Sequence, residues 1–289
     1  MSRSGHRVLG VGGESVGVGE EWWWRPPIPP AAPPGMVSKE EYTAKWNSFA
    51  EQGFAPWDSG EPTSQLVELV ASSTHWRALW DAAQPRPLRC ADIGCGSGAS
   101  TRWLASQGTE ALGVDLVPGL VEKARGAATT GVVGQGARTP LFAQGDIFAL
   151  PPGFSYSQVA AAQGVAATPA EEDEVGAFDF VFDSQCFHVL RVHDEPAAVA
   201  AIAALLRPGG LLLVLTGNAN EPEVSPAVLT REELTTAFER DRQFALVEIK
   251  ESRFDATEEG AYAQAKTPLA WVALFRRLSS APEPASAPL

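Results

Sequence analysis

Short apolar runs alternate with stretches of helical periodicity along most of this chain, and this alternation limits the folds that it can adopt. Each run has the length and apolar content of a strand buried inside a sheet. The predicted strands are residues 88–93, 111–116, 141–144, 178–183, 211–215, 244–249 and 269–276. Because strands that alternate with helices build parallel sheets covered on both faces, the sequence predicts an α/β fold with a doubly wound, mainly parallel seven-strand sheet.

Helix signals lie between the predicted strands. Asp194 and Pro196 supply an N-cap residue and a first-turn proline for an alanine-rich helix, which the Pro-Gly-Gly sequence at 208–210 ends. Thr230 and Glu233 have the spacing of a capping box, in which each side chain bonds the backbone N–H of the other residue. These signals place helices where a doubly wound sheet requires them.

Two segments interrupt the alternation. Residues 126–136 are rich in glycine, and residues 155–176 form an insertion rich in alanine and acids. The insertion contains four consecutive acids at 171–174, and such a charge run is typical of a solvated loop. We therefore expect both segments to lie outside the regular helices and strands.

The two ends of the chain differ from its body. The first part is rich in glycine and then in proline, without apolar periodicity. We expect residues 1–36 to be a disordered extension, residues 37–279 to form one domain and residues 280–289 to be a disordered tail. Within the domain, residues 37–84 are expected to form a helical cover and residues 85–279 the core.

The helical cover contains two predicted helices. The first follows Met36, a candidate true start, and begins at the capping box of Ser38. The second opens at Pro62 and continues until prolines break the chain at 85 and 87. Their apolar faces carry Tyr42, Trp46 and Phe49 in the first helix and Leu66, Leu69 and Val70 in the second.

Composition excludes several functional classes. With 35 acidic and 22 basic residues, the chain lacks the basic surface that nucleic-acid binding requires. Its longest apolar run, residues 197–206, is shorter than the ~18 residues of a membrane span. Three cysteines make no disulfide framework, and no His/Cys cluster has zinc-ligand spacing. We expect a cytoplasmic monomer or weak homodimer that binds no nucleic acid, membrane or metal.

A glycine loop follows the first predicted strand, where residues 90–98 read CADIGCGSG. Gly94, Gly96 and Gly98 alternate, which allows a tight turn whose backbone a ligand can approach. Dinucleotide-binding loops have the different spacing G-x-G-x-x-G and cradle a pyrophosphate. Asp92, two residues before the first glycine, suits a cationic ligand instead. The loop therefore speaks against a nicotinamide-dependent oxidoreductase.

The sequence DIGCGSG resembles the first motif of class I S-adenosylmethionine-dependent methyltransferases. The positive sulfonium and amino groups of that cofactor match an acidic loop. The resemblance implies a Rossmann-like fold and S-adenosylmethionine as cofactor. It also implies that the loop binds the cofactor through Asp92, Gly94, Cys95, Gly96 and Gly98.

The resemblance continues in the same order along the chain, through residues 206–210 before the fifth strand. It implies that Asp115, followed by Leu116, binds the ribose hydroxyls, and that Asp146 and Ile147 hold the adenine. Asp183 ends the fourth strand, at the edge where such sheets bind ligands, and is a cofactor-binding and catalytic candidate. Without this resemblance, the alternatives are that Asp115 caps a helix, Asp146 forms a turn and Asp183 is a surface acid.

Trp46 and residues 53–62 resemble the N-terminal segment of thiopurine S-methyltransferase-like and halide/thiol methyltransferases. By this resemblance Trp46 and Trp57 cover the methionine end of the cofactor, where an indole face attracts a sulfonium. The alternative is that both indoles belong to the core. The plant members carry Pro-Gly-Cys-Gly where this chain has Asp92 to Cys95. This departure leaves the expected cofactor site intact but weakens the case for a thiopurine or halide substrate.

The second catalytic candidate is His188, in a Gln-Cys-Phe-His sequence that resembles bacterial small-molecule methyltransferases. It is expected to act as a general base or to orient an acceptor, or else to satisfy a backbone carbonyl. The expected function is methyl transfer from S-adenosylmethionine to a small molecule, a thiol or other soft nucleophile, by in-line displacement. O- or N-methylation and a catalytically silent binding module remain open.

Overall fold

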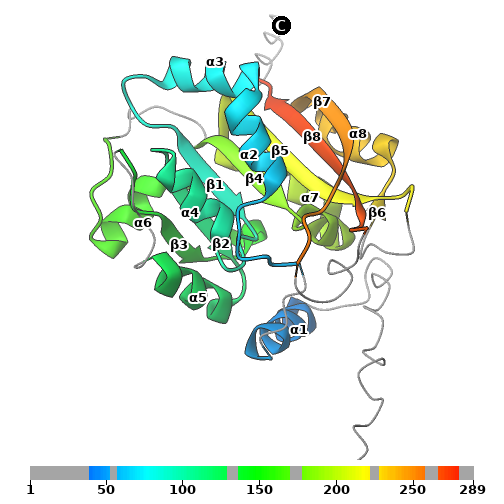
Figure 1. Ribbon diagram of the computed structural model, residues 1–289, viewed down its shortest axis with the longest axis horizontal. Helices are drawn as coiled ribbons and strands as arrows, with labels where there is room; N and C mark the ends of the chain where they lie inside the picture. Colours follow the sequence, from blue (N-terminus) through cyan, green and yellow to red (C-terminus); the bar gives the residue numbers. More distant parts are fainter. Residues whose placement is uncertain are drawn as a thin grey trace, which may run out of the picture.

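The computed structural model describes residues 39–52, 57–128, 136–169, 178–221, 228–257 and 266–279. In these residues one sheet has the strand order β3-β2-β1-β4-β5-β8-β7, and a short β6 pairs with β5 (Figure 1). The strands are β1 (Arg89–Ile93), β2 (Glu110–Asp115), β3 (Leu141–Gln144), β4 (Phe178–Ser184), β5 (Leu206–Asn218), β6 (Val228–Leu229), β7 (Phe244–Arg253) and β8 (Leu269–Arg277).

The strands β1 to β6 pair in parallel, and β8 runs antiparallel to both β5 and β7. The predicted doubly wound, mainly parallel sheet is therefore confirmed, with β6 as an addition. Two residues are too short a run to show a periodicity, so β6 was not predicted. In register, Ile93 of β1 lies opposite Asp183 of β4, and Asp115 of β2 lies opposite Gln144 of β3. The carboxyl ends of these strands thus form one edge.

Helices cover both faces of the sheet (Figure 1). On one face α2 to α5 pack through residues such as Leu66, Trp76 and Leu104. On the other, α6 to α8 pack through residues such as Ile202 and Phe238. Burying a side chain of this size stabilises the fold by roughly 1.5–3 kcal/mol. The helices are α1 (Lys39–Glu51), α2 (Ser64–Ser72), α3 (Thr74–Ala83), α4 (Ala99–Ser106), α5 (Pro118–Ala128), α6 (Tyr156–Gln163), α7 (Phe187–Leu205) and α8 (Arg231–Glu239), with 3-10 turns η1 (Ile147–Ala149) and η2 (Arg240–Arg242).

Two predicted helix starts are confirmed. Thr230 and Glu233 form the capping box of α8, with bonds of 3.1 and 2.8 Å. Asp194 accepts a hydrogen bond of 2.9 Å from the N–H of Ala197, as an N-cap residue does. Its φ of −160° breaks α7 into two parts at the predicted start of the alanine-rich helix. The first part of α7 was not predicted, and it begins directly after the turn that follows β4.

Two expectations about helices were wrong. The single helix after Pro62 is two helices, because Ser73 is extended and its hydroxyl accepts the N–H groups of His75 and Trp76 to start α3. The insertion at 155–176 contains α6, which begins at the N-cap Ser155. Alanine favours helix formation, but it is small and only weakly apolar. An alanine-rich segment therefore shows no clear helical periodicity of apolar residues.

Several expectations fall on residues outside the described ranges. These are the disordered ends at 1–36 and 280–289, the cap at Ser38, the acids at 171–174 and the start of the loop at 53–56. Of the helices that the structure describes, none has the length and apolar content needed to cross a membrane.

Candidate functional site

The glycine loop joins β1 to α4 at the carboxyl edge of the sheet. The N–H groups of Gly94 and Cys95 donate to the carbonyl of Val114 in β2, at 2.8 and 3.1 Å, and the N–H of Gly98 donates to the carbonyl of Cys95 at 2.8 Å. Gly94, Gly96 and Gly98 have φ values of +66°, +54° and +77°. Residues with a Cβ rarely adopt this left-handed backbone conformation, so the tight turn requires glycine.

The three glycines differ in what surrounds them. A Cβ on Gly94 would lie 2.7 Å from Cβ of Cys186, and one on Gly98 would lie 2.4 Å from the ring of Phe142. Both positions are closed by packing. A Cβ on Gly96 would meet no atom of the described residues within 4 Å, so the backbone is open there. Such an open cradle fits a ligand that contacts the loop backbone, as S-adenosylmethionine is expected to do.

Asp115 ties this loop to the end of β2. Its Oδ2 accepts a hydrogen bond of 2.9 Å from the N–H of Gly96, and its Oδ1 accepts one of 2.9 Å from the N–H of Val117. Burial raises the pKa of this carboxyl, while these backbone bonds lower it. Asp115 therefore caps the chain entering α5 and also lies beside the open glycine. Its assignment to the ribose stays a prediction.

Asp92 lies beneath the loop and is buried. The hydroxyl of Thr101, in α4, donates a hydrogen bond of 2.6 Å to Oδ2 of Asp92. Burial, with a smaller contribution from the charge of Asp115, raises the pKa of Asp92 to about 7. The acid therefore holds α4 against the loop.

Asp183 is the penultimate residue of β4 and is 0% exposed. Its carboxylate accepts hydrogen bonds from the N–H groups of Cys186 and Phe187, at 3.2 and 2.8 Å. Burial raises its pKa to about 7, and the charge of Asp92 adds to this shift. The reading of Asp183 as a surface acid is wrong. In this structure the side chain fixes the turn between β4 and α7.

His188 lies in the first turn of α7 and is only 4% exposed. Its Nδ1 is 3.4 Å from the hydroxyl of Thr216, near the carboxyl end of β5. Burial lowers the pKa of the imidazole to about 4, so the ring is neutral at pH 7. The contact that the structure records is with a side chain, not with a backbone carbonyl.

Asp146 and Ile147 follow β3. Oδ1 of Asp146 accepts a hydrogen bond of 3.1 Å from the N–H of Phe148 and so starts η1. The N–H of Gly145 donates to the carbonyl of Asp115 at 2.9 Å, which holds this segment beside the end of β2. Sequence reasoning missed Phe148, which is 39% exposed. A large aromatic side chain exposed at the carboxyl edge is a signal for ligand contact.

Trp46 and Trp57 lie together, with ring centroids 5.2 Å apart in an edge-on arrangement. Phe49 joins them at 5.7 Å from Trp46, and the cation of Lys45 lies 5.7 Å from the Trp46 ring. Helix α1, which carries Trp46 but not Trp57, contacts α5 and lies apart from the sheet in Figure 1. Trp57 also packs against the core cluster of the α2–α4 face, as the core alternative expects for this indole. The contact of the two indoles with a cofactor stays a prediction.

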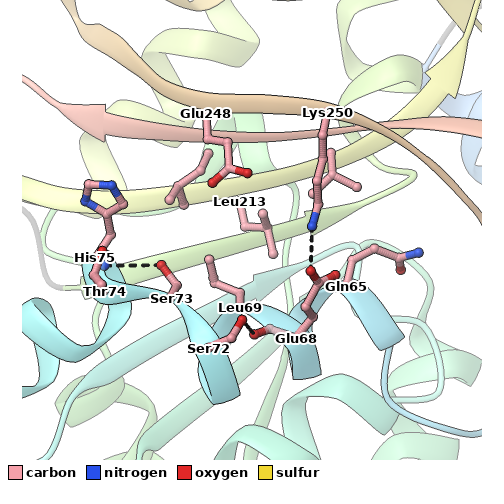
Figure 2. Close-up of a pocket in the computed structure, with 12 residues that line it drawn as sticks. Gln65, Glu68, Leu69, Ser72, Ser73, Thr74, His75, Leu213, Glu248 and Lys250 are labelled. Atoms are coloured by element: carbon pink, nitrogen blue, oxygen red, sulfur yellow. Dashed lines mark hydrogen bonds and ion pairs between the residues drawn. The ribbon is translucent and has the colours of Figure 1, made fainter.

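A separate groove lies on the α2–α3 face of the sheet (Figure 2), and no residue of the glycine loop lines it. Its volume is about 290 Å³, and an ion pair of 2.7 Å between Glu68 and Lys250 joins its two walls. Leu69, Leu213 and Leu274 are among the apolar residues that line it. It contains none of the predicted site residues, of which Asp92, Asp115, Asp146 and Asp183 lie at or near the carboxyl ends of β1, β2, β3 and β4.

Comparisons with known proteins show the family to which the chain belongs. The family model described as a methyltransferase domain matches residues 61–250. Thiocyanate methyltransferase 1 of Brassica oleracea is 28% identical over 74% of this chain and 80% of its own length. Ubiquinone biosynthesis O-methyltransferase of Xanthomonas axonopodis is 26% identical over 68% of this chain and 70% of its own.

The fold is shared with solved structures. A SAM-dependent methyltransferase from Anabaena variabilis aligns with a TM-score of 0.57 and 16% identity, over 85% of this chain and 97% of its own length. The family model covers residues 61–250, which include most of the predicted core. The chain therefore belongs to the methyltransferase domain family and is a class I S-adenosylmethionine-dependent methyltransferase.

Proposed function

We propose that this enzyme methylates a small molecule at a thiol or another soft nucleophile, by in-line displacement at the methyl carbon. The observation that carries the choice of acceptor is the burial of His188, whose pKa is lowered to about 4. A general base works best when its pKa lies near the operating pH. An imidazole this weak is poorly suited to take a proton from a hydroxyl, whereas a thiol with a pKa of about 8.5 ionises without help.

The cofactor would lie along the carboxyl edge of the sheet. In this proposal Asp146 and Ile147 hold the adenine, Asp115 and Leu116 the ribose, and the loop from Gly94 to Gly98 the methionine part. The order of the strands β3, β2 and β1 supports this assignment, because it lines up these residues in the order of the cofactor's parts. When bound, S-adenosylmethionine supplies an electrophilic methyl group on a sulfonium.

The chain's own residues then contribute alignment and charge. The loop backbone at Gly96 is open to the ligand, and the bond from Asp115 holds it in place. Buried Asp92 and Asp183 lie at the ends of neighbouring strands and favour a cationic ligand. The indoles of Trp46 and Trp57 are proposed to cover the site and exclude water. Fixing two reactants in this way can lower a barrier by about 7–11 kcal/mol in favourable cases.

The relatives leave a second candidate. Thiocyanate is a soft sulfur-containing anion, as this proposal requires, but the ubiquinone relative is named as an O-methyltransferase. O-methylation therefore remains the alternative, and it would need a base to remove the hydroxyl proton. Asp183 is the carboxyl that could serve as this base, because its pKa is raised to about 7. Its oxygens already accept hydrogen bonds from backbone N–H groups, however.

The first experiment is calorimetric titration with S-adenosylmethionine, S-adenosylhomocysteine and NAD, followed by an acceptor screen. The screen contains thiocyanate, thiophenol, an aliphatic thiol, a catechol and a primary amine. We expect binding of the two adenosyl compounds, no binding of NAD, and turnover of a sulfur acceptor. Turnover of only the catechol or the amine would overturn the thiol proposal. Binding without any turnover would instead favour a silent binding module.

We also propose a reducing compartment such as the cytoplasm, with the protein a monomer or weak homodimer that binds neither nucleic acid nor membrane. All three cysteines, Cys90, Cys95 and Cys186, are free thiols, which supports a reducing environment. The net charge of −13 supports the absence of a nucleic-acid partner. Analytical ultracentrifugation would test the oligomeric state directly.

A further inference from the structure

A glutamine with left-handed backbone occupies the turn after β4. Gln185 has a φ of +66°, which suits glycine but is uncommon for a residue with a Cβ. Nine glycines of the described residues have positive φ, so this chain usually has glycine where its backbone takes that conformation. The two other exceptions, Asp241 and Arg242, lie in η2 at the surface. Gln185 is therefore the one non-glycine residue of the described ranges that has a positive φ outside η2.

Contacts with three strands fix this turn. The N–H of Gln185 donates to the carbonyl of Leu215 in β5 at 2.9 Å. The carboxylate at the end of β4, Asp183, accepts the N–H groups of the two residues after Gln185. Cys186 packs against Gly94, at the end of β1. A left-handed residue that its surroundings hold so firmly is typical of functional sites.

The turn also lies at a special place in the sheet. The strand order β3-β2-β1-β4-β5 reverses direction between β1 and β4, and ligands of such sheets bind outside the carboxyl ends at this point. The proposed cofactor parts take up the ends of β3, β2 and β1. The next position along the edge is the end of β4, where the half-buried Gln185 lies.

We infer that Gln185 is an acceptor-binding residue, whose side-chain amide hydrogen-bonds the small molecule that receives the methyl group. This inference rests on the proposed function and names a residue for its acceptor site. An amide both donates and accepts hydrogen bonds, so it can hold polar groups beside the reacting atom without removing a proton. Glycine would relax the backbone but would lack this contact.

The test compares two substitutions with a matched control. Gln185→Gly removes the amide and relaxes the backbone, whereas Gln185→Met keeps the length of the side chain and the left-handed backbone without the amide. Asp241→Gly relaxes the same kind of backbone at η2, away from the carboxyl edge, and serves as the control. The measurements are the melting temperature, the Kd of S-adenosylhomocysteine, and kcat and KM with thiocyanate or thiophenol, whichever wild type methylates faster.

We expect both Gln185 variants to lose about tenfold in kcat/KM for the acceptor, with less than a twofold change in the Kd of S-adenosylhomocysteine. Gln185→Gly should melt at or above the wild-type temperature, so that misfolding does not explain its loss. Wild-type kcat/KM in both variants, or a matching loss of S-adenosylhomocysteine affinity, would overturn the acceptor contact alone. A wild-type protein that binds no adenosyl compound and methylates nothing would overturn the proposed function together with this inference.

Discussion

The N–H of Gly96 donates a 2.9 Å hydrogen bond to Oδ2 of Asp115, so the open glycine of the loop is tied to the end of the neighbouring strand. Two features that the sequence reasoning assigned to different parts of the cofactor are therefore one unit. A change at either residue therefore acts on the other.

Asp115→Ala should weaken S-adenosylmethionine binding by roughly 1.5–3 kcal/mol for each charged hydrogen bond lost. The variant removes both the proposed ribose acceptor and the support of the loop. Calorimetric titration measures the change, and circular dichroism checks the fold. Glu68→Ala, in the groove on the α2–α3 face that no residue of the glycine loop lines, should leave the affinity unchanged. Unchanged affinity in Asp115→Ala would remove the ribose assignment.

Gly96→Ala should mainly weaken cofactor binding, whereas Gly98→Ala should mainly lower the melting temperature. Both place a side chain at positive φ, which costs roughly 1–2 kcal/mol. The new Cβ at Gly98 also lies 2.4 Å from the ring of Phe142, whereas the one at Gly96 meets nothing within the described residues. We expect the larger loss of melting temperature in Gly98→Ala and the larger loss of cofactor affinity relative to stability in Gly96→Ala. Equal effects on both measurements would contradict the open cradle at Gly96.

The stability of the folded protein should depend on pH through Asp183. Its pKa rises from 3.8 to about 7 on folding, so between these values the folded state holds a proton that the unfolded chain has released. The free energy of unfolding therefore falls as the pH rises through this window, and above pH 7 the loss is complete. Buried Asp92 acts in the same direction.

Asp183→Asn should flatten this pH dependence, because an amide has no proton to lose. Urea unfolding of wild type and variant at pH 4.5, 6 and 7.5 measures the difference, and the variant's relative stability should increase with pH. The surface variant Glu248→Gln supplies the control. Parallel stability curves for wild type and Asp183→Asn would mean that the carboxyl is already ionised at pH 4.5.

Turnover of a thiol acceptor should rise with pH until the thiol is largely ionised, near its pKa of about 8.5. Acceptors of lower pKa should react faster at pH 7, since the thiolate is the reacting species. His188→Ala should cost less than the ~10²–10⁴-fold loss that follows removal of a general base. A loss within that range, together with turnover of a hydroxyl acceptor, would support the O-methylation alternative instead.

Local signals in the sequence determined most of the fold. The strand at 141–144 and the capping box at Thr230 appear in the structure as predicted. Such elements follow from side-chain spacing and capping within a few residues, which any stretch of sequence displays. The motif DIGCGSG likewise determined the loop, because its glycines are required by backbone angles that side chains rarely adopt.

Tertiary structure decided the surroundings of the site. Pairing of β1 with β4 sets Asp183 opposite Ile93, and it brings Cys186 of the following turn against Gly94. Packing buries His188 beside Thr216 and so lowers its pKa, which no spacing of residues could have indicated. The hydrogen bond from the N–H of Gln185 to the carbonyl of Leu215 likewise joins its left-handed turn to β5. Burial and strand pairing join residues that are far apart in the chain, so the chemical state of these groups exists only once the sheet has formed.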